Sequence, residues 1–501
     1  MTNKIVLTIM GMVLLGASST VGQSYVEEAL IVSRIRPGGS ARIQAMGGAQ
    51  TALGADISSA YYNPAGLGMY NRSDFSFTPA YSITNYSSTY FGNKSTDTRT
   101  NLIIPNLGVA FHTGQDGQKG LWGGTFGINF NRVNDFNETF TYSGTNPDNS
   151  IIDYFINEAS GTNTSQFSNT GSNYNTPTGL GYFNYLFGPQ DILSPPGPSD
   201  QYFTDVTGIP LQKEIVKNSG SQNQWSLAYG VNFKDKLFLG GGIGFTSITY
   251  RSEKTYTETF SDAGQPMSTM QLREALSLDG SGINATVGVI YRPINTLQLG
   301  FSAATPTTYE ISDNYSAVMS SSWNAFEYQP GKILNAESAS TDNLTSTYNL
   351  ITPWRLSLGM THFFGKNGFL SADVEWLAYG NTKYDPENDY SVENTQISNT
   401  YKSGFNLRLG GEYRLNNYRL RAGYSLMPDP FHSKQNGVDR TISSITTGVG
   451  YRTAKFYVDM AVVHSFGDTS YRPYQLNYAL DPLVMQSKKN TTILFTVGIP
   501  F

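Results

Sequence analysis

The sequence predicts an all-β protein: a 14-stranded antiparallel transmembrane β-barrel with an N-terminal hatch, or plug, inside the lumen. Three observations carry this prediction. Charged residues make up only 14% of the 501 residues while aromatic residues reach 13%, and 51 residues are glycine. Stretches of about ten residues alternate apolar and polar side chains, as strands between lipid and lumen do. The connections between these stretches alternate long and short.

The composition excludes several classes of function. Cysteine is absent, which removes disulfides and thiolate chemistry. The four histidines are scattered without the spacing of paired metal ligands, so no metal and no cofactor is expected. A net charge of −5 argues against a nucleic-acid partner.

The first 22 residues are predicted to be a secretory signal peptide. Lys4 gives the positive start, an apolar run follows from Ile5 to Gly16, and Thr20-Val21-Gly22 offers small residues for cleavage. The run is too short to span a bilayer as a helix. A buried N-terminal strand is the alternative interpretation.

Alternation marks each strand. In one example Trp225, Leu227 and Tyr229 alternate with Ser226, Ala228 and Gly230. The fourteen predicted strands cover 74–83, 103–112, 122–130, 224–233, 237–250, 282–291, 295–303, 354–363, 368–378, 403–413, 418–426, 443–451, 454–464 and 491–501.

The connections give the barrel, 74–501, its expected orientation. Long loops are predicted at 131–223, 251–281 and 304–353, with tight turns such as 234–236 between them. Outer-membrane barrels have short periplasmic turns and long extracellular loops. Because the strand count is even, both termini are expected in the periplasm of a Gram-negative bacterium. Phe501 ends an alternating strand, which resembles the signal read by the barrel-assembly machinery, a partner during biogenesis. We expect a monomer surrounded by outer-membrane lipid.

Residues 23–73 precede the first strand and are predicted to form the hatch. They are rich in small residues and glycine and lack regular alternation. Irregular backbone at membrane depth survives only inside protein or beside water, so this segment is expected to fold into the lumen.

Two blocks of sequence resemble a known family. The first runs from Met46-Gly47-Gly48-Ala49 to Asn63-Pro64-Ala65-Gly66-Leu67. The second runs from Gly282-Ile283-Asn284 through Tyr291-Arg292-Pro293 to Leu299-Gly300-Phe301-Ser302 and Thr305-Pro306. Together with the strand count, they make the chain similar to the FadL/TodX family of outer-membrane transporters for long-chain fatty acids and aromatic hydrocarbons.

The resemblance implies passive uptake of a hydrophobic ligand, without a cofactor and without catalysis. Extracellular loops capture the ligand, which enters the barrel and leaves sideways through a kinked strand while the hatch blocks a straight aqueous path. Asn63, Pro64 and Ala65 correspond to the hatch motif; a plain turn and a structural hinge remain alternatives for it. The family's opening lies in the third strand, here 122–130, where Gly123, Gly124 and Gly127 could loosen pairing.

Apolar segments in the long loops are candidate ligand contacts. Those in 251–281 fall at helical spacing. Such segments either pack on each other as a cap or form a groove for the ligand. The candidates are Phe155, Tyr182, Phe183, Phe187, Met270 and Leu276.

Charged residues on the strands are expected to face the lumen, since charges facing lipid are destabilising. The predicted lumen cluster consists of Asp373, Glu375, Arg408, Glu412, Arg419 and Arg421. We favour an ionic clamp on the hatch because acids and bases are mixed; the alternative is an arginine that receives a ligand carboxylate.

Two other functions are weighed against uptake. One is a non-transporting barrel that acts as a partner in an envelope secretion or assembly complex. The other is an outer-membrane lipid hydrolase, which needs a serine beside a histidine. His464 and Ser465 are adjacent, but neighbouring residues on a strand point to opposite faces.

Overall fold

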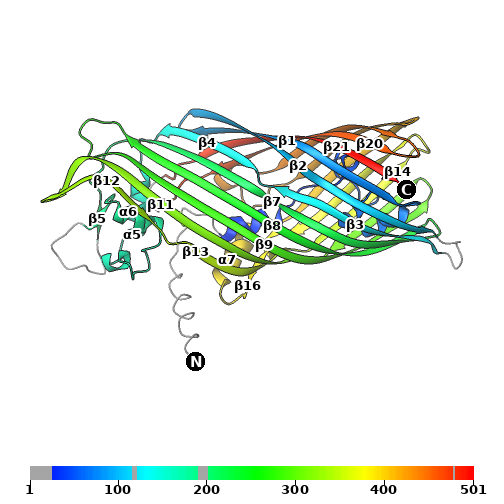
Figure 1. Cartoon of the computed structure of the whole chain (residues 1–501), viewed down its shortest axis with the longest axis horizontal. Helices are drawn as coiled ribbons and strands as arrows, with labels where there is room; N and C mark the ends of the chain where they lie inside the picture. The colour runs from blue at the N-terminus through cyan, green and yellow to red at the C-terminus, as the bar shows by residue number, and fades with distance from the viewer. Residues whose placement is uncertain (1–24, 115–120, 190–200, 478–479) are drawn as a thin grey trace, which may run out of the picture.

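The computed structural model describes residues 25–114, 121–189, 201–477 and 480–501, so the predicted signal peptide lies outside the described residues. Fourteen strands form a closed antiparallel barrel (Figure 1), each paired with the next and the last with the first. All fourteen predicted strands are confirmed. They are β1 (Asp74–Tyr90), β2 (Asn93–Gly114), β3 (Leu121–Asp135), β7 (Pro210–Phe233), β8 (Leu237–Phe260), β9 (Met267–Ile294), β10 (Leu297–Ala304), β14 (Arg355–Phe363), β15 (Gly368–Ala378), β17 (Ser403–Leu415), β18 (Tyr418–Met427), β19 (Ile442–Arg452), β20 (Tyr457–Tyr471) and β21 (Val484–Pro500).

Several strands run far beyond the predicted ends, which corrects the loop assignments. Residues 84–102, which separate the first two predicted strands, are mostly strand, because β1 and β2 meet in a tight hairpin at residues 91–92. The expected loop 251–281 is mostly the ends of β8 and β9, so its predicted helical character is wrong. Within 131–223 and 304–353, further strands extend the wall: β4 (Glu138–Thr145), β11 (Thr308–Gln329), β12 (Lys332–Ser340) and β13 (Leu344–Ile351).

The remaining elements lie along the lumen or at the end of the barrel that carries the long connections, here called the long-loop end. The helices are α2 (Tyr25–Ser33), α3 (Ala41–Gln44), α4 (Ser59–Tyr62), α5 (Ile151–Ala159), α6 (Pro177–Phe183) and α7 (Ser391–Thr400). Short 3₁₀ helices are η1 (Pro64–Met69), η3 (Thr164–Phe167), η4 (Tyr379–Asn381) and η5 (Gln435–Gly437). Short strands are β5 (Gly188–Pro189), β6 (Tyr202–Phe203) and β16 (Lys383–Asp385).

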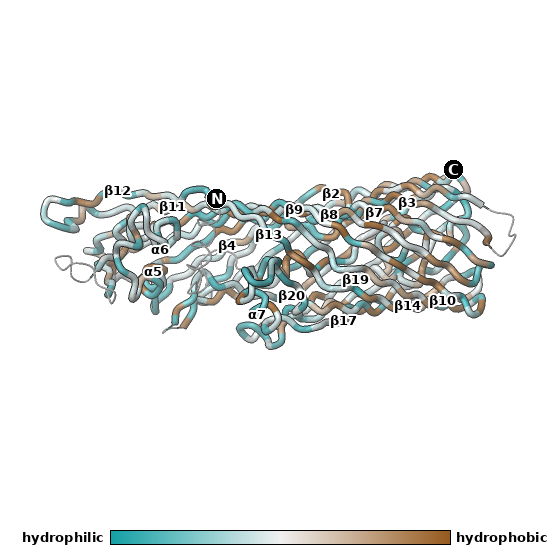
Figure 2. The backbone as a smooth tube through the Cα atoms, turned by 90° about the horizontal axis from the view of Figure 1, so that it is seen from below, coloured by the Kyte–Doolittle hydropathy of each residue, from teal (hydrophilic) through white to brown (hydrophobic). Residues whose placement is uncertain are grey.

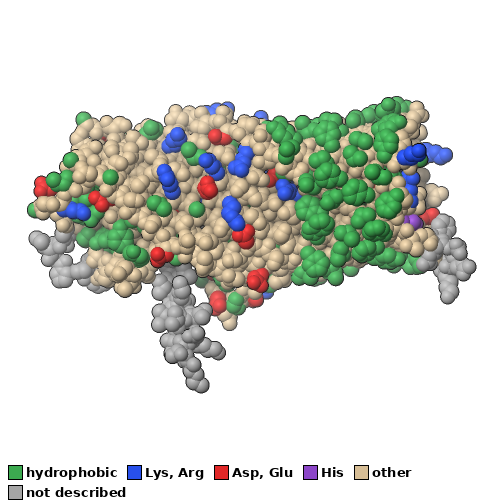
Figure 3. All heavy atoms as spheres, in the orientation of Figure 1, with side chains coloured by type: hydrophobic (Ala, Val, Ile, Leu, Met, Phe, Trp, Pro, Cys, Tyr) green, Lys and Arg blue, Asp and Glu red, His purple; other side chains and the backbone are tan. Residues whose placement is uncertain are grey.

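An apolar band surrounds the half of the barrel nearest the short turns, here called the short-turn end (Figures 2 and 3). Along β8 the exposed outer side chains Ile243 and Phe245 are apolar, whereas Ser247 and Thr249 further along are polar. The band therefore ends near this level, and the barrel continues past it with a polar exterior. On β7 this extension is residues 210–224, on the order of 40 Å high at ordinary strand rise and tilt.

Across the described ranges, no helix is both long enough and apolar enough to cross a bilayer.

Residues 25–73 lie inside the barrel (Figure 1, dark blue). Their backbone lies directly against glycines on the inner wall: a Cβ built at Gly448 would be 2.6 Å from Ala45 Cβ, and one at Gly230 would be 2.5 Å from Pro64 O. Glycine at these wall positions lets the hatch and the wall approach closely. The abundance of glycine therefore serves the fit between the hatch and the barrel as well as the strands themselves.

Candidate functional site

The hatch motif lies where the hatch meets β8, β9 and β10. Asn63 is fully buried and precedes η1, and its Oδ1 accepts a hydrogen bond from the Ala65 amide at 3.2 Å. Its Nδ2 donates to Thr51 O at 2.6 Å, with the wall carbonyl of Phe301 at 3.3 Å. Pro64 occupies the first turn of η1, where a missing amide hydrogen costs nothing. The motif thus shapes a turn and attaches it to the wall, and its role in transport stays a prediction.

An ionic network joins the hatch to the wall. Arg408 pairs with Glu375 at 2.6 Å. Arg421 bridges Glu412 at 2.8 Å and Asp459 at 2.5 Å. These five side chains are all buried. Because each arginine has an acidic partner, the arrangement supports the clamp rather than a free carboxylate receptor.

The hatch contacts this network at Glu412 and binds the neighbouring wall residue Asp373. Arg42 lies 3.9 Å from Glu412, and the amides of Gln50 and Thr51 both donate to Asp373 Oδ2 at 2.7 Å. Arg419 does not join the cluster. It is half-buried near the short-turn end and donates to the carbonyls of Asn416 and Tyr418.

The wall has a gap between β2 and β3. Their ladder ends at Asn106 opposite Asn131, and β2 has Pro105, which lacks an amide hydrogen, at the next position. Beyond that level β3 shifts register against β7 between Arg132 and Asn134. Beyond the gap β2 lies beside β4, and side chains of β2 join the two strands: Arg99 donates to the carbonyl of Glu138, and Asp97 accepts from the Thr141 amide at 2.7 Å.

This gap lies on the strand where the resemblance implies an opening, but further along it. Gly123, Gly124 and Gly127 are all paired with β2, so the expected loosening at 122–130 is wrong in position. Pro105 and the register shift at residues 132–134 mark the position of the gap instead. A proline inside a predicted strand was the signal in the sequence that could have located the break.

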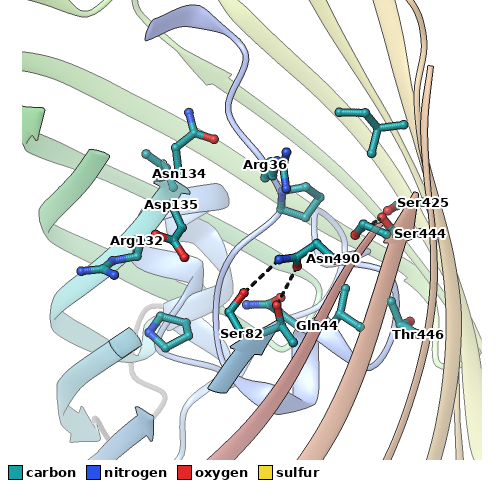
Figure 4. A pocket seen from close by; sticks show the side chains of 18 of the residues that line it. Arg36, Gln44, Ser82, Arg132, Asn134, Asp135, Ser425, Ser444, Thr446 and Asn490 are labelled. Carbon is teal, nitrogen blue, oxygen red and sulfur yellow. Dashed lines mark hydrogen bonds between the residues drawn. The ribbon is translucent and has the colours of Figure 1, made fainter. Parts of the chain in front are cut away.

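A cavity of about 110 Å³ lies inside the lumen behind the gap (Figure 4). The gap contributes Ile103, Arg132 and Val133 to its lining, and the hatch contributes Arg36 and Gln44. The adjoining strands β1 and β21 add hydroxyl and amide side chains, such as Asn490, which donates to Ser82 at 2.9 Å.

The hatch covers the inner side of the gap. The Arg36 amide donates to Val133 O at 3.0 Å, and Asn134 Nδ2 contacts Arg34 O at 3.4 Å. The hatch therefore forms hydrogen bonds with the segment of β3 that is no longer paired with β2. Unlike Arg408 and Arg421, Arg36 forms no ion pair with an acid in the described part of the chain, although it lines the cavity.

The candidate ligand contacts of the loops lie above the apolar band in packed clusters. Phe155, Phe187 and Met270 are buried in one cluster formed by α5, α6, β9 and β11. Tyr182 packs against this cluster and stacks on Phe167 with centroids 4.9 Å apart, and Phe183 contacts the Tyr182 ring. Leu276 belongs instead to the cluster around α2. This geometry fits the cap interpretation. None of the six lines the lumen cavity, and their role as ligand contacts stays a prediction.

Sequence reasoning missed a buried acid in the first helix. Glu28 on α2 is 4% exposed, and the Tyr348 hydroxyl donates to both of its carboxylate oxygens at 2.7 and 2.8 Å. Burial raises the pKa of Glu28 to about 8, and the Tyr348 hydrogen bond offsets only part of that rise. Nothing in the local sequence distinguishes this glutamate from exposed Glu27.

The geometry gives no support to the hydrolase alternative. His464 Nδ1 lies 2.9 Å from Thr491 Oγ1, whereas Ser465 Oγ lies 2.8 Å from Ser444 Oγ and lines the lumen cavity. The two residues therefore face opposite sides of the wall. Within the described ranges, no three His, Asp or Glu side chains come close enough together to hold a metal ion.

Comparison with known proteins finds one family and several solved structures. Residues 218–493 match the family model "Outer membrane protein transport protein (OMPP1/FadL/TodX)". A FadL homologue from Pseudomonas aeruginosa superposes with a TM-score of 0.56 at 12% identity, covering 94% of this chain and 100% of its own. No curated protein sequence matches the chain.

Two toluene transporters share the same fold. TbuX from Ralstonia pickettii gives a TM-score of 0.51 at 13% identity. TodX from Pseudomonas putida gives 0.50 at 12% identity. Each alignment covers 93% of this chain and 99% of the other. At such identities the likeness establishes the architecture only.

Proposed function

Because the chain belongs to the OMPP1/FadL/TodX family of outer-membrane transport proteins, we propose that it admits hydrophobic or amphipathic small molecules passively and releases them sideways through the β2–β3 gap. The short-turn end faces the periplasm and the long-loop end faces outward, as in other barrels of this membrane. Cargo enters at the long-loop end, passes down the lumen and reaches the cavity above the hatch.

One observation supports this route above all: the cavity lies behind a break in the wall at the upper edge of the apolar band. Leu102, beside the gap, is 83% exposed, and Trp225 on β7 is exposed near the same level. A molecule that leaves here passes into lipid without crossing the hatch. An apolar cargo favours that exit over the aqueous periplasm.

The cavity also suggests what cargo it accepts. Long-chain fatty acids and aromatic hydrocarbons are the substrate classes that the family resemblance implies. If the cargo carries a carboxylate, Arg36 is its partner, because the arginines of the clamp are already paired with acids. Arg36→Gln is then expected to lower fatty-acid uptake more than uptake of an uncharged aromatic hydrocarbon.

Blocking the gap tests the route. Ile103 lines the cavity, whereas its neighbour Ile104 faces outward. Ile103→Trp fills the passage and is expected to reduce uptake of a labelled fatty acid or toluene into cells at least tenfold, with Ile104→Trp as the matched control. Equal uptake by the two variants would refute lateral release through this gap.

A disulfide that locks the hatch in place tests separately whether uptake requires the hatch to move. Ser33 Oγ and Thr382 Oγ1 are 2.9 Å apart and buried, so Ser33→Cys with Thr382→Cys can form a disulfide in a chain without other cysteines. Thr361→Cys with Ser371→Cys is the control, since those hydroxyls are 2.8 Å apart within the wall. We expect uptake to fall only in the oxidised hatch pair and to recover on reduction. Unchanged uptake in the oxidised hatch pair would show that transport proceeds with α2 in place.

A further inference from the structure

A large apolar groove lies on the outer, lipid-facing surface of β15, β17 and β18. Its volume is about 1230 Å³. Small outward-facing residues form its floor: Gly411 pairs with Ala422, and Ala372 lies one strand over. Exposed large side chains stand around them, namely Met360, Leu370, Leu409, Tyr413, Leu420 and Tyr424. The groove therefore has a floor of small residues and sides formed by bulky ones.

The groove extends to the short-turn end. Its lining includes Phe364 and Asn367, which belong to the β14–β15 turn. The Arg414 amide donates to Asn367 O at 2.7 Å, and Arg414 is paired across the ladder with Arg419. Lys366, Arg414 and Arg419 therefore gather where the groove meets the membrane surface.

These cations have little acidic compensation. Arg414 pairs with Glu412, but Lys366 is exposed and neither it nor Arg419 forms an ion pair in the part of the chain that the structure describes. Other basic residues continue around the same rim, and the acids among its described turns and strand ends include Asp235 and Asp74. Those basic residues are Arg72, Lys234, Lys236, Arg292, Arg452 and Lys455. Figure 3 shows Lys and Arg side chains just beyond the apolar band at this end.

We propose that the groove binds one anionic phospholipid of the periplasmic leaflet, such as phosphatidylglycerol. Its acyl chains lie over Ala372, Gly411 and Ala422, and its phosphate lies at Lys366 and Arg419. Two facts favour this occupant: the groove is apolar within the membrane band, and the end that opens at the headgroup level is positively charged. An anionic headgroup gains energy there that a zwitterionic one does not.

The position also ties the lipid to the hatch. The same strands carry Arg408, Glu412 and Arg421 on their inner face, and the hatch backbone at Met46 lies against Gly410. A lipid in the groove therefore lies on the outer face of the strands whose inner face carries the clamp.

Lipid retention by the full chain tests the proposal. The protein is purified from nanodiscs of equal phosphatidylglycerol and phosphatidylethanolamine, and retained lipids are counted by native mass spectrometry. Ala422→Phe fills the floor and is expected to abolish retention; Val287→Phe, equally outward on β9, is its control. Lys366→Gln is expected to lower the preference for phosphatidylglycerol about fivefold, while Lys236→Gln in the β7–β8 turn leaves it unchanged.

Retention in Ala422→Phe equal to that in Val287→Phe would overturn the proposal. So would a phosphatidylglycerol preference that survives Lys366→Gln, since that result indicates an unselective lipid shell. Heat-dependent gel mobility confirms that each variant is folded, and Lys366, in an exposed turn, gives a decisive result even if the filled groove prevents folding. Uptake need not change in Lys366→Gln, which separates this outcome from the proposed transport route.

Discussion

The most informative single substitution is Glu28→Gln in the first helix of the hatch. Glu28 lies above the apolar band, packed among Tyr25, Tyr348 and Tyr384, and it forms no ion pair in the described part of the chain. Its pKa rises from 4.5 to about 8 because burial disfavours the carboxylate. A raised pKa means that docked α2 holds this proton more tightly than undocked α2. Docking is therefore strongest below about pH 4.5 and weakens as pH rises toward 8.

The size of the effect follows from these two pKa values. If undocking returns Glu28 to water and to 4.5, raising the pH from 6 to 9 weakens docking by about 3 kcal/mol, roughly a hundredfold in the opening constant. Glutamine keeps the shape and accepts the Tyr348 hydrogen bond but cannot ionise. The pH dependence should vanish in Glu28→Gln and persist in Glu27→Gln, which changes an exposed neighbour.

Hydrogen–deuterium exchange of the α2 amides measures this opening directly. Exchange is followed at pH 6 and pH 9 and corrected for its intrinsic pH dependence. We expect wild type and Glu27→Gln to lose protection at pH 9, with Glu28→Gln equally protected at both. Wild-type protection that is the same at both pH values, or a pH effect that remains in Glu28→Gln, would refute the reasoning.

Two further substitutions test the contact between hatch and wall and an ion pair of the clamp within the wall. A Cβ at Gly288 would overlap Asn63 Oδ1, so Gly288→Leu should displace the hatch and raise ion conductance in planar bilayers; Gly241→Leu, whose nearest neighbour would be 3.9 Å away, should not. Arg408→Gln leaves Glu375 buried without its cation and should cost about 3–5 kcal/mol, seen as a lower unfolding temperature on heat-modified gels. A melting temperature equal to wild type would remove the clamp as a source of stability.

The strands were predictable where one face meets lipid, and only there. Alternation such as that of 225–233 exists because outer side chains must be apolar while inner ones face a polar lumen. Above the band both faces of β7 are rich in polar residues, so the pattern that marks a strand disappears although the strand continues.

The error at 267–278 has a specific cause. Met270, Leu272, Leu276 and Leu278 are all even-numbered, so they also fit a strand with one apolar face, which is how they stand in β9. A short set of apolar residues can match the period of a helix and the period of a strand. The length of the neighbouring strand then decides between the two structures.

Only part of the candidate site could be predicted from the sequence. Strand parity placed Asp373, Glu375, Arg408, Glu412 and Arg421 inward, and it failed for Arg419 because the lumen ends before that residue. Pairing partners such as Asp97 with Thr141, or the break between β2 and β3, depend on contacts between distant segments. Alternation along one strand carries no information about its neighbour's register.

The polar upper wall determines how far from the bilayer the barrel opens. With rims standing on the order of 40 Å above the hydrocarbon, the entrance of the barrel opens well outside the lipid headgroups. A hydrophobic molecule that follows the proposed route therefore enters the lumen before it reaches the polar surface of the bilayer.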